Sequence, residues 1–196
     1  MTTEQMIQMS EMHLAPYMQI AATNLIGKSR EAGGNMFRHQ LDTMSILIDY
    51  SYIDSILLKA AIVHDVLEDV PDFNHDTLLS IDFESHAVYD LVREVTRRPS
   101  ETKGEFLTRI RESGSRNAKI LKAADRISNM ISLGFVNNLE FVERYINETE
   151  QYILPIAAEV SQYMFTELGH LLDSRRKYLE DFHNLKSGAQ GEGKTH

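Results

Sequence analysis

Apolar residues recur at three- and four-residue spacing along almost the whole chain, and this periodicity limits the fold more than any other feature of the sequence. It is clearest in residues 10–27, 41–70 and 85–98, and it is the pattern of helices that bury one face. Only four prolines and ten glycines occur in 196 residues, and no segment of useful length alternates as a half-buried strand does. The sequence therefore predicts an all-α fold, and its length suits one domain with a substantial core.

The composition limits what such a helical domain can do. Its 42% apolar and 25% charged residues are ordinary for a soluble globular protein. We expect no membrane span, because no run of 18 apolar residues occurs, and no secretory signal in residues 1–13. The net charge of −9 argues against binding to nucleic acid or to an anionic membrane surface. The absence of cysteine fits a reducing cytoplasm and leaves only nitrogen and oxygen ligands for a metal.

Prolines and the composition of the C-terminus suggest where the domain and its helices end. Pro16 predicts a kink or the first turn of a second helix, and Pro71 predicts the end of a central helix. Pro155 predicts the start or kink of a helix that runs toward Leu172. We expect an exposed loop over residues 97–105 and one domain over residues 1–186. The glycine-rich polar segment 187–196 predicts a disordered tail.

One imidazole and three carboxylates follow directly after the apolar residues Ala-Ala-Ile-Val in the central helical segment. If residues 57–69 form one helix, His64 and Glu68 share one face, and Asp65 and Asp69 share the adjoining face. Like charges this close are destabilising unless a cation or a proton offsets them. The alternative is a solvated charged face with a single core histidine. The adjacent acids and the apolar flank favour a site for Mn, Fe, Zn or a similar divalent ion.

Two ligands cannot hold a catalytic metal, so others are needed from elsewhere in the chain. The candidates are His39, in the segment FRHQL, and Asp125, in LKAADRISNM. In the second segment Asp125, Arg126 and Asn129 interrupt an apolar helix. Taken alone, Asp125 is more simply explained by a surface ion pair with Arg126 or Lys122.

Together these segments resemble the hydrolase domain of the RelA/SpoT group and, in size, the small alarmone hydrolases of the HD phosphohydrolase superfamily. The family pattern is a histidine before a helix, then HDxxED, an ADRxxNM-type segment, and RxxxET leading to a proline. Here these parts are His39, residues 64–69, residues 124–130, residues 144–149 and Pro155. The resemblance covers roughly residues 17–160, and it implies a single HD-domain helical bundle.

The resemblance implies a Mn²⁺-dependent hydrolase, with another divalent metal as an alternative. Such an enzyme removes the 3′-diphosphate of the alarmone nucleotide (p)ppGpp and leaves GDP or GTP and pyrophosphate. The implied metal ligands are His39, His64, Asp65 and Asp125. Glu68 and Asp69 would be the acid pair that positions and activates water, with Glu68 handling the proton and Asp69 orienting the site. The implied substrate-binding residues are Lys28, Arg30, Lys122, Asn129, Ser132 and Arg144.

Several positions depart from the family pattern. Gln40 stands where the family often has a proline after the first histidine, Ser128 replaces a common histidine, and Ile131 replaces a basic residue. The segment before His39 also lacks the usual Arg-Lys pair. The metal set is therefore intact while the base-recognition set has drifted, so (p)ppApp is a further or alternative substrate.

Two other functions stay open from the sequence. The first is a different nucleotide phosphohydrolase of the HD superfamily. The second is a non-catalytic HD module that binds a nucleotide or a partner protein. The ADRxxN and RxxxET segments favour the alarmone hydrolase, and degenerate members lose a ligand or the acid pair, whereas this chain keeps all six residues. The chain length leaves no room for a synthetase domain, so we expect a cytoplasmic, stand-alone hydrolase of undetermined oligomeric state.

Overall fold

A computed structural model describes residues 1–191, except for the side chains of residue 183 and residues 185–191. The described part is helical, and its only β-type pairing is an isolated bridge between Ser29 and Asn35. The helices of the N-terminal half are α1 (Thr3–Ser10), α2 (Ala15–Leu25), α3 (Met36–Asp49), α4 (Ser55–Val63), α5 (Val66–Asp69), α6 (His75–Leu79) and α7 (Ser85–Val95). Those of the C-terminal half are α8 (Lys103–Ser113), α9 (Arg116–Ser132), α10 (Leu139–Glu148), α11 (Leu154–Val160) and α12 (Gln162–Gly191).

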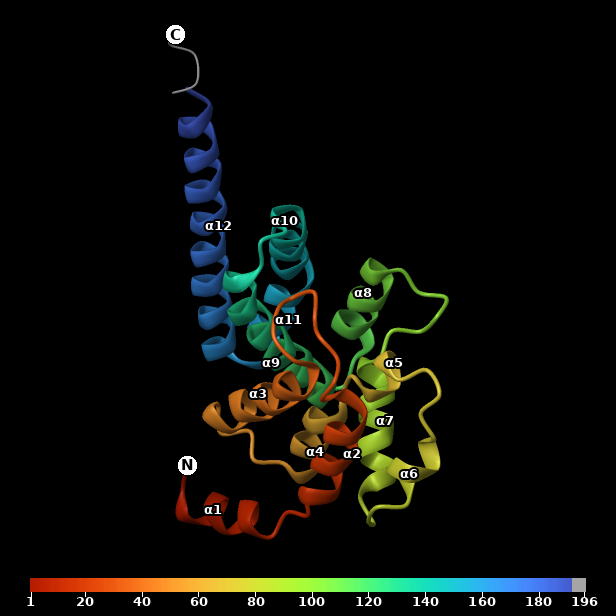
Figure 1. The fold of residues 1–196 in the computed structure, drawn as a ribbon. Coiled ribbons are helices and arrows are strands. Elements are labelled where there is room, and N and C mark those ends of the chain that lie inside the picture. Colours follow the sequence, from red (N-terminus) through yellow and green to blue (C-terminus); the bar gives the residue numbers. More distant parts are fainter. Residues whose placement is uncertain (192–196) are drawn as a thin grey trace.

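Helix α9 is the centre of the bundle (Figure 1), packed by α3, α4, α7, α11 and α12. Every residue from Ala118 to Met130 is buried, so the polar residues of this helix need partners inside the protein. A short 3₁₀ turn, Leu133–Phe135, follows α9. A π-helical segment, Thr149–Ile153, joins α10 to α11. The central helix therefore presents its polar side chains to the interior, where a site can form.

Residues 57–69 do not form the single helix that we considered from the sequence. They belong to two helices. Helix α4 ends at Val63, and α5 begins at Val66. The Ala61 carbonyl, which would accept the Asp65 amide in a continuing helix, instead lies 2.8 Å from Nδ1 of His64. The amide of Asp65 turns to Oε1 of Gln40, 3.5 Å away. The break places His64 and Asp65 on a turn between two helices.

Three of the four prolines lie at or near the start or end of a helix. Pro16 lies in the first turn of α2 and Pro155 in the first turn of α11, while α5 ends at Asp69, shortly before Pro71. Helix α11 stops at Val160, so Pro155 does not begin one long helix toward the C-terminus.

Helix α12 packs on the bundle only along its first part and then extends away from it (Figure 1). Met164, Leu168 and Leu172 are buried at successive four-residue intervals. The helix continues through residues 187–191, which we expected in the disordered tail, and residues 192–196 of that expected tail lie outside the described residues.

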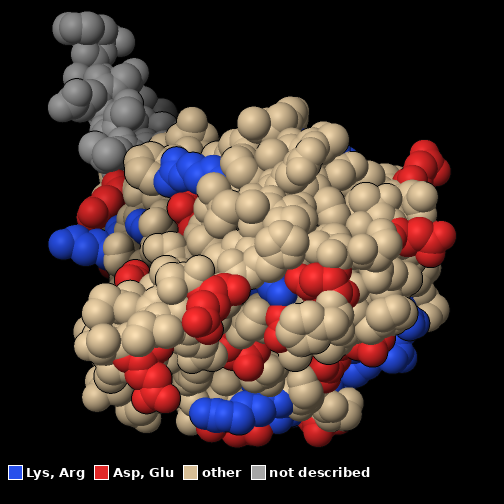
Figure 2. Space-filling view, turned by 90° about the horizontal axis from the view of Figure 1, so that it is seen from below, with Lys and Arg blue, Asp and Glu red and all other residues tan. Residues whose placement is uncertain are grey.

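The surface carries the negative charge that the composition predicts. Figure 2 shows the face seen from below, where Asp and Glu side chains are spread over the surface with Lys and Arg among them, and no extended basic area appears. Within the described part of the chain, no helix combines the length and the apolar character needed to span a membrane.

Candidate metal centre and its cavity

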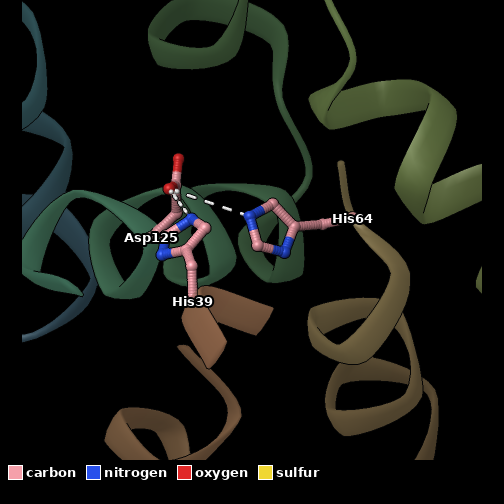
Figure 3. Close-up of side chains that lie close together, drawn as sticks. All are labelled: His39, His64 and Asp125. Carbon is pink, nitrogen blue, oxygen red and sulfur yellow. Dashed lines mark ion pairs between the residues drawn. The ribbon is translucent and has the colours of Figure 1, made fainter. Parts of the chain in front are cut away.

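Three helices bring His39, His64 and Asp125 together (Figure 3). His39 comes from α3, His64 follows the last residue of α4, and Asp125 lies in the middle of α9. One ligand atom from each residue lies within 4.8 Å of the other two. Oδ1 of Asp125 is 3.0 Å from Nε2 of His39 and 3.7 Å from Nε2 of His64. Residues 25 and 61 positions apart in the sequence thus form one buried cluster.

Asp65 adjoins this cluster from the turn between α4 and α5. Its Oδ1 is 3.3 Å from Nε2 of His64, and its Oδ2 is 3.6 Å from Nε2 of His39. Its side chain is 22% exposed, whereas those of His39, His64 and Asp125 are almost fully buried. The structure therefore brings together all four side chains that the family resemblance implies as metal ligands.

The hydrogen bonds of His64 leave one nitrogen free to bind a metal. Nδ1 donates to the carbonyl of Ala61, which places the lone pair of the neutral ring on Nε2. This Nε2 is buried and has no hydrogen-bond partner among the described residues. It faces the carboxylates of Asp65 and Asp125. Because buried polar atoms are nearly always paired, an orphan nitrogen beside two carboxylates fits a divalent cation with nitrogen and oxygen ligands.

The titration behaviour of the cluster reflects the same excess of negative charge. Burial lowers the pKa of His39, against the opposing effect of the two carboxylates. Burial also acts to lower the pKa of His64, but the charges of Asp65 and Asp125 outweigh it and raise that pKa to about 8. For Asp125, burial is overcome by Lys122 and both histidines, and its pKa lies well below the usual value. The carboxylates therefore stay charged and attract a cation.

Gln40 and Ser128, two of the departures from the family pattern, support the ligands. Nε2 of Gln40 donates to Oδ2 of Asp65 at 2.8 Å, and Oγ of Ser128 lies 2.8 Å from Nδ1 of His39. Both side chains are buried. Contacts of this kind orient metal ligands and set their tautomers. We did not predict these roles, although the two positions stood out in the sequence.

Asp125 is also contacted by two side chains of its own helix, α9. Nζ of Lys122 lies 2.7 Å from Oδ2, and the amide of Asn129 donates to Oδ1 at 2.6 Å. Arg30, on the loop between α2 and α3, in turn donates to Oδ1 of Asn129. The pair of Asp125 with Lys122 is therefore buried and part of the site, and the surface pair that we considered as an alternative is wrong.

Within the described part of the chain, the Arg126 side chain makes no ion pair with Asp125 and instead joins the ADR segment to the RxxxET segment. It is 1% exposed, and its Nη1 donates to Oγ1 of Thr149 at 3.1 Å. Its Nη2 lies 3.5 Å from Glu148, and its guanidinium lies 4.0 Å from the ring centroid of Tyr145. The two motifs are therefore one structural unit, which fixes α10 against α9.

A cavity of about 350 Å³ opens over the cluster. His39, Asp65 and Asp125 line it, together with both acids of the predicted pair, Glu68 and Asp69. The predicted substrate-binding residues that line it are Arg30, Lys122 and Asn129. The cavity wall therefore combines three of the four candidate ligands with two further carboxylates and several cations.

The other three predicted substrate-binding residues do not line this cavity. Lys28 donates to the backbone carbonyl of Asp69. The side chain of Arg144 is 59% exposed and lies 3.9 Å from Glu31. Ser132 lies beneath the loop, where its carbonyl would be 3.3 Å from a Cβ added at Gly33. All three residues lie near the site without forming part of the cavity wall.

Lys103, Phe141 and Tyr145 line the cavity and were missed by sequence reasoning. We expected residues 97–105 to be an exposed loop. In the structure, Thr102 caps α8 through a capping box with Glu105, so the helix begins at Lys103. That pattern, Thr followed three residues later by Glu, is visible in the sequence. Burial, with the charges of Lys122 and Arg126, lowers the pKa of Lys103 to about 8.

The two acids of the predicted pair have different surroundings. Burial, with the negative charges of Asp65 and Glu68, raises the pKa of Asp69 to about 6. Oε1 of Glu68 lies 3.8 Å from Nε of Arg97, and its side chain is 35% exposed. Asp69 can therefore carry a proton close to neutral pH.

Among solved structures, the chain is similar to a protein described as a metazoan ortholog of SpoT that hydrolyzes ppGpp and plays a role in starvation responses. The TM-score is 0.71 at 24% sequence identity, and the alignment covers 83% of this chain and 94% of that one. No protein-family model matches the chain, and no curated protein matches it by sequence. The shared fold confirms the all-α helical bundle expected from the sequence.

Proposed function

We propose that this protein is a metal-dependent phosphohydrolase that removes the 3′-diphosphate from a ppGpp-like nucleotide. The observation that carries the proposal is the buried Nε2 of His64, which has no partner among the described residues and faces two carboxylates. The acid pair and the cations of the same cavity supply the other groups that the reaction needs. The fold shared with a ppGpp-hydrolysing protein is consistent with this substrate class.

His39, His64, Asp65 and Asp125 would hold the metal, and Mn²⁺ is the ion that the family resemblance implies. A divalent ion bound there lowers the pKa of a water molecule and polarises a phosphate oxygen. Gln40 holds one oxygen of Asp65 and Ser128 contacts His39, so both ligands are oriented before a metal binds.

The acid pair would manage the protons of the reaction. Hydrolysis leaves a 3′-hydroxyl and pyrophosphate, so one proton leaves the attacking water and one reaches the ribose oxygen. Glu68 is the proposed acceptor of the first proton, because it lines the cavity and is partly exposed to solvent. Asp69 orients the water, and its raised pKa of about 6 also allows it to hold a proton.

The cations of the cavity would bind the phosphates. Arg30, Lys103 and Lys122 line the cavity beside the candidate ligands, and they offset locally the net charge of −9. Tyr145 and Phe141 form an aromatic part of the wall, where a base can stack. None of these contacts distinguishes guanine from adenine, so (p)ppApp is the second substrate that we propose to test.

The deciding experiment measures pyrophosphate release from ppGpp and from ppApp, with Mn²⁺ and with a chelator. We expect release only with metal, and a loss of about 10²- to 10⁴-fold in kcat for Glu68→Gln. Glu105→Gln is a matched control, because Glu105 caps α8 and does not line the cavity. If the protein binds Mn²⁺ but hydrolyses neither compound, the alarmone assignment is wrong, and a general nucleotide phosphohydrolase becomes the better proposal. If it binds no divalent metal, the proposal fails altogether.

A further inference from the structure

A second cavity, of about 470 Å³, lies next to the candidate site and is lined by four arginines. They come from α7, from the loop that follows it and from α8, and they are Arg93, Arg97, Arg98 and Arg109. Asp90 and Glu94 are the acids of the same lining. The cavity wall is therefore net positive, although the net charge of the chain is −9. Such a local positive region attracts anions.

Arg109 has a structural role that makes this wall rigid. Its guanidinium donates to Glu101 at 2.7 Å, to the carbonyl of Glu94 at 2.8 Å and to the carbonyl of Thr96 at 3.1 Å. These bonds tie the loop between α7 and α8 to α8. Arg97 and Arg98 therefore project from a backbone that is already fixed, which lowers the entropy lost when they bind a ligand.

The other three arginines are only weakly neutralised. Arg93 lies over the ring of Tyr89, 5.8 Å from its centroid, and has no carboxylate within 4.0 Å among the described residues. Arg97 is 3.8 Å from Glu68. Arg98 is 3.8 Å from Glu101, which Arg109 already holds. Long contacts between exposed groups contribute little, so these guanidinium groups keep donors for another anion.

The acids of the lining do not cancel these charges. Both oxygens of Glu94 are engaged by Ser115, one with its backbone amide and the other, at 2.8 Å, with its hydroxyl. Asp90 is exposed. The aromatic rings of Tyr89 and His75 also form part of the wall, with ring centroids 5.5 Å apart. A flat ring can stack there while phosphates meet the arginines.

We propose that this cavity is a second binding site, separate from the candidate metal centre, for the phosphate groups of a nucleotide. Guanidinium groups pair well with phosphate oxygens, and the aromatic wall accommodates a base. Arg97 links the two sites, because a phosphate bound to Arg97 would compete with Glu68 for its guanidinium group. Binding at the arginine cavity and the charge of Glu68 are therefore coupled. The binding itself holds whether or not the function proposed above is correct.

The test is NMR titration of the metal-free protein, in chelator, with GTP and with guanosine as the uncharged control. We expect GTP to shift the backbone amides of Tyr89, Arg93 and Thr96 in a saturable manner, and guanosine to do so far more weakly. Arg93→Gln and Arg97→Gln should each weaken this binding about tenfold. Arg38→Gln removes the same charge from an exposed helical pair with Asp42. It should change the affinity for GTP by no more than about twofold.

The coupling has its own expected result. Glu68→Gln removes the carboxylate that competes for Arg97, so GTP should bind the arginine cavity about two- to threefold more tightly. The amide of Asn129, which lines the other cavity, distinguishes the two sites. The proposal is overturned if GTP shifts Asn129 and its neighbours but not Tyr89 and Thr96, or shifts neither. It is also overturned if Arg38→Gln weakens binding as much as the two cavity variants do.

Discussion

Gln40 is a residue whose importance comes from where its two amide atoms point. Its side chain is 0% exposed, its Nε2 holds Oδ2 of Asp65 at 2.8 Å, and its Oε1 faces the amide of Asp65. One side chain on α3 therefore contacts the backbone at the turn after α4 and also orients a candidate ligand. The sequence shows glutamine at this position, but nothing local shows that its partner lies 25 residues away.

We predict that Gln40→Ala weakens Mn²⁺ binding about 10- to 100-fold, because a ligand without its supporting hydrogen bond is less well oriented. Isothermal titration calorimetry on the metal-free protein measures the effect directly. Gln19→Ala, at an exposed position of α2, is the control and should bind as the wild type does. Equal affinities for the wild type and the Gln40 variant would show that Asp65 needs no such support.

Lys103 is held in the cavity at a cost to stability. Its pKa falls to about 8 because burial and the neighbouring charges of Lys122 and Arg126 disfavour its charged form. Below pH 8 the folded and unfolded states both carry the proton, and the penalty is fully present. Between pH 8 and the unfolded value near 10.5 the folded state loses its proton first, so the penalty disappears as the pH rises.

We therefore expect Lys103→Met to raise the free energy of unfolding at pH 7, and this gain to shrink as the pH approaches 10. Urea denaturation at the two pH values measures it. The same variant should raise the KM for the nucleotide, because a cation of the cavity is lost. Lys177→Met, at an exposed position of α12, should change neither quantity. A destabilised Lys103 variant at pH 7 would contradict the argument.

At the scale of the elements, most of the helices follow from the apolar spacing and the prolines, and the exceptions share a cause. At the break after α4 the Asp65 amide contacts the distant Gln40, and the start of α8 at Lys103 is capped by the Thr102–Glu105 capping box. The π-helical turn at Thr149–Ile153 has no local sequence signal that we recognise. Local periodicity cannot show contacts between distant helices, so it predicts the helices better than their ends.

The contact between α9 and the start of the π-helical segment gives a prediction at this scale. Oγ1 of Thr149 accepts a hydrogen bond from the buried Arg126. Thr149→Val keeps the shape but leaves a buried donor without that partner, so we expect the free energy of unfolding to fall by about 1–3 kcal/mol. Thr166→Val is the matched control, because that hydroxyl bonds only to its own exposed helix. Similar losses for both variants, measured by chemical denaturation, would rule out a special role for Arg126.

At the scale of the whole molecule, the candidate centre joins helices that are distant in the sequence. Its ligands come from α3, the turn after α4, and α9, so an ion bound there bridges the two halves of the bundle. The family resemblance implied four ligands, and the structure brings their side chains together. It identified only part of the cavity wall, because the wall depends on how α8 and α10 pack on α9.

A bound ion should therefore stabilise the whole fold. At a free Mn²⁺ concentration of 100 times Kd, we expect the free energy of unfolding to rise by about 2.7 kcal/mol. His64→Ala should abolish this gain, whereas His170→Ala, on α12 and outside the cluster, should retain it. Thermal and urea unfolding with and without Mn²⁺ provide the comparison. An equal gain in the His64 variant would mean that the ion binds elsewhere.

The π-helical turn Thr149–Ile153 also bears on how such a cavity can change during evolution. A π-turn contains one residue more than the α-helical turn it replaces, and each residue of an α-helix turns the chain by about 100°. Deleting one residue here would restore an ordinary helix and rotate α10 by that angle relative to α11. Phe141 and Tyr145 would leave the cavity, and other side chains of α10 would replace them. A single-codon insertion or deletion at this turn can therefore exchange one wall of the cavity while the candidate metal ligands stay in place.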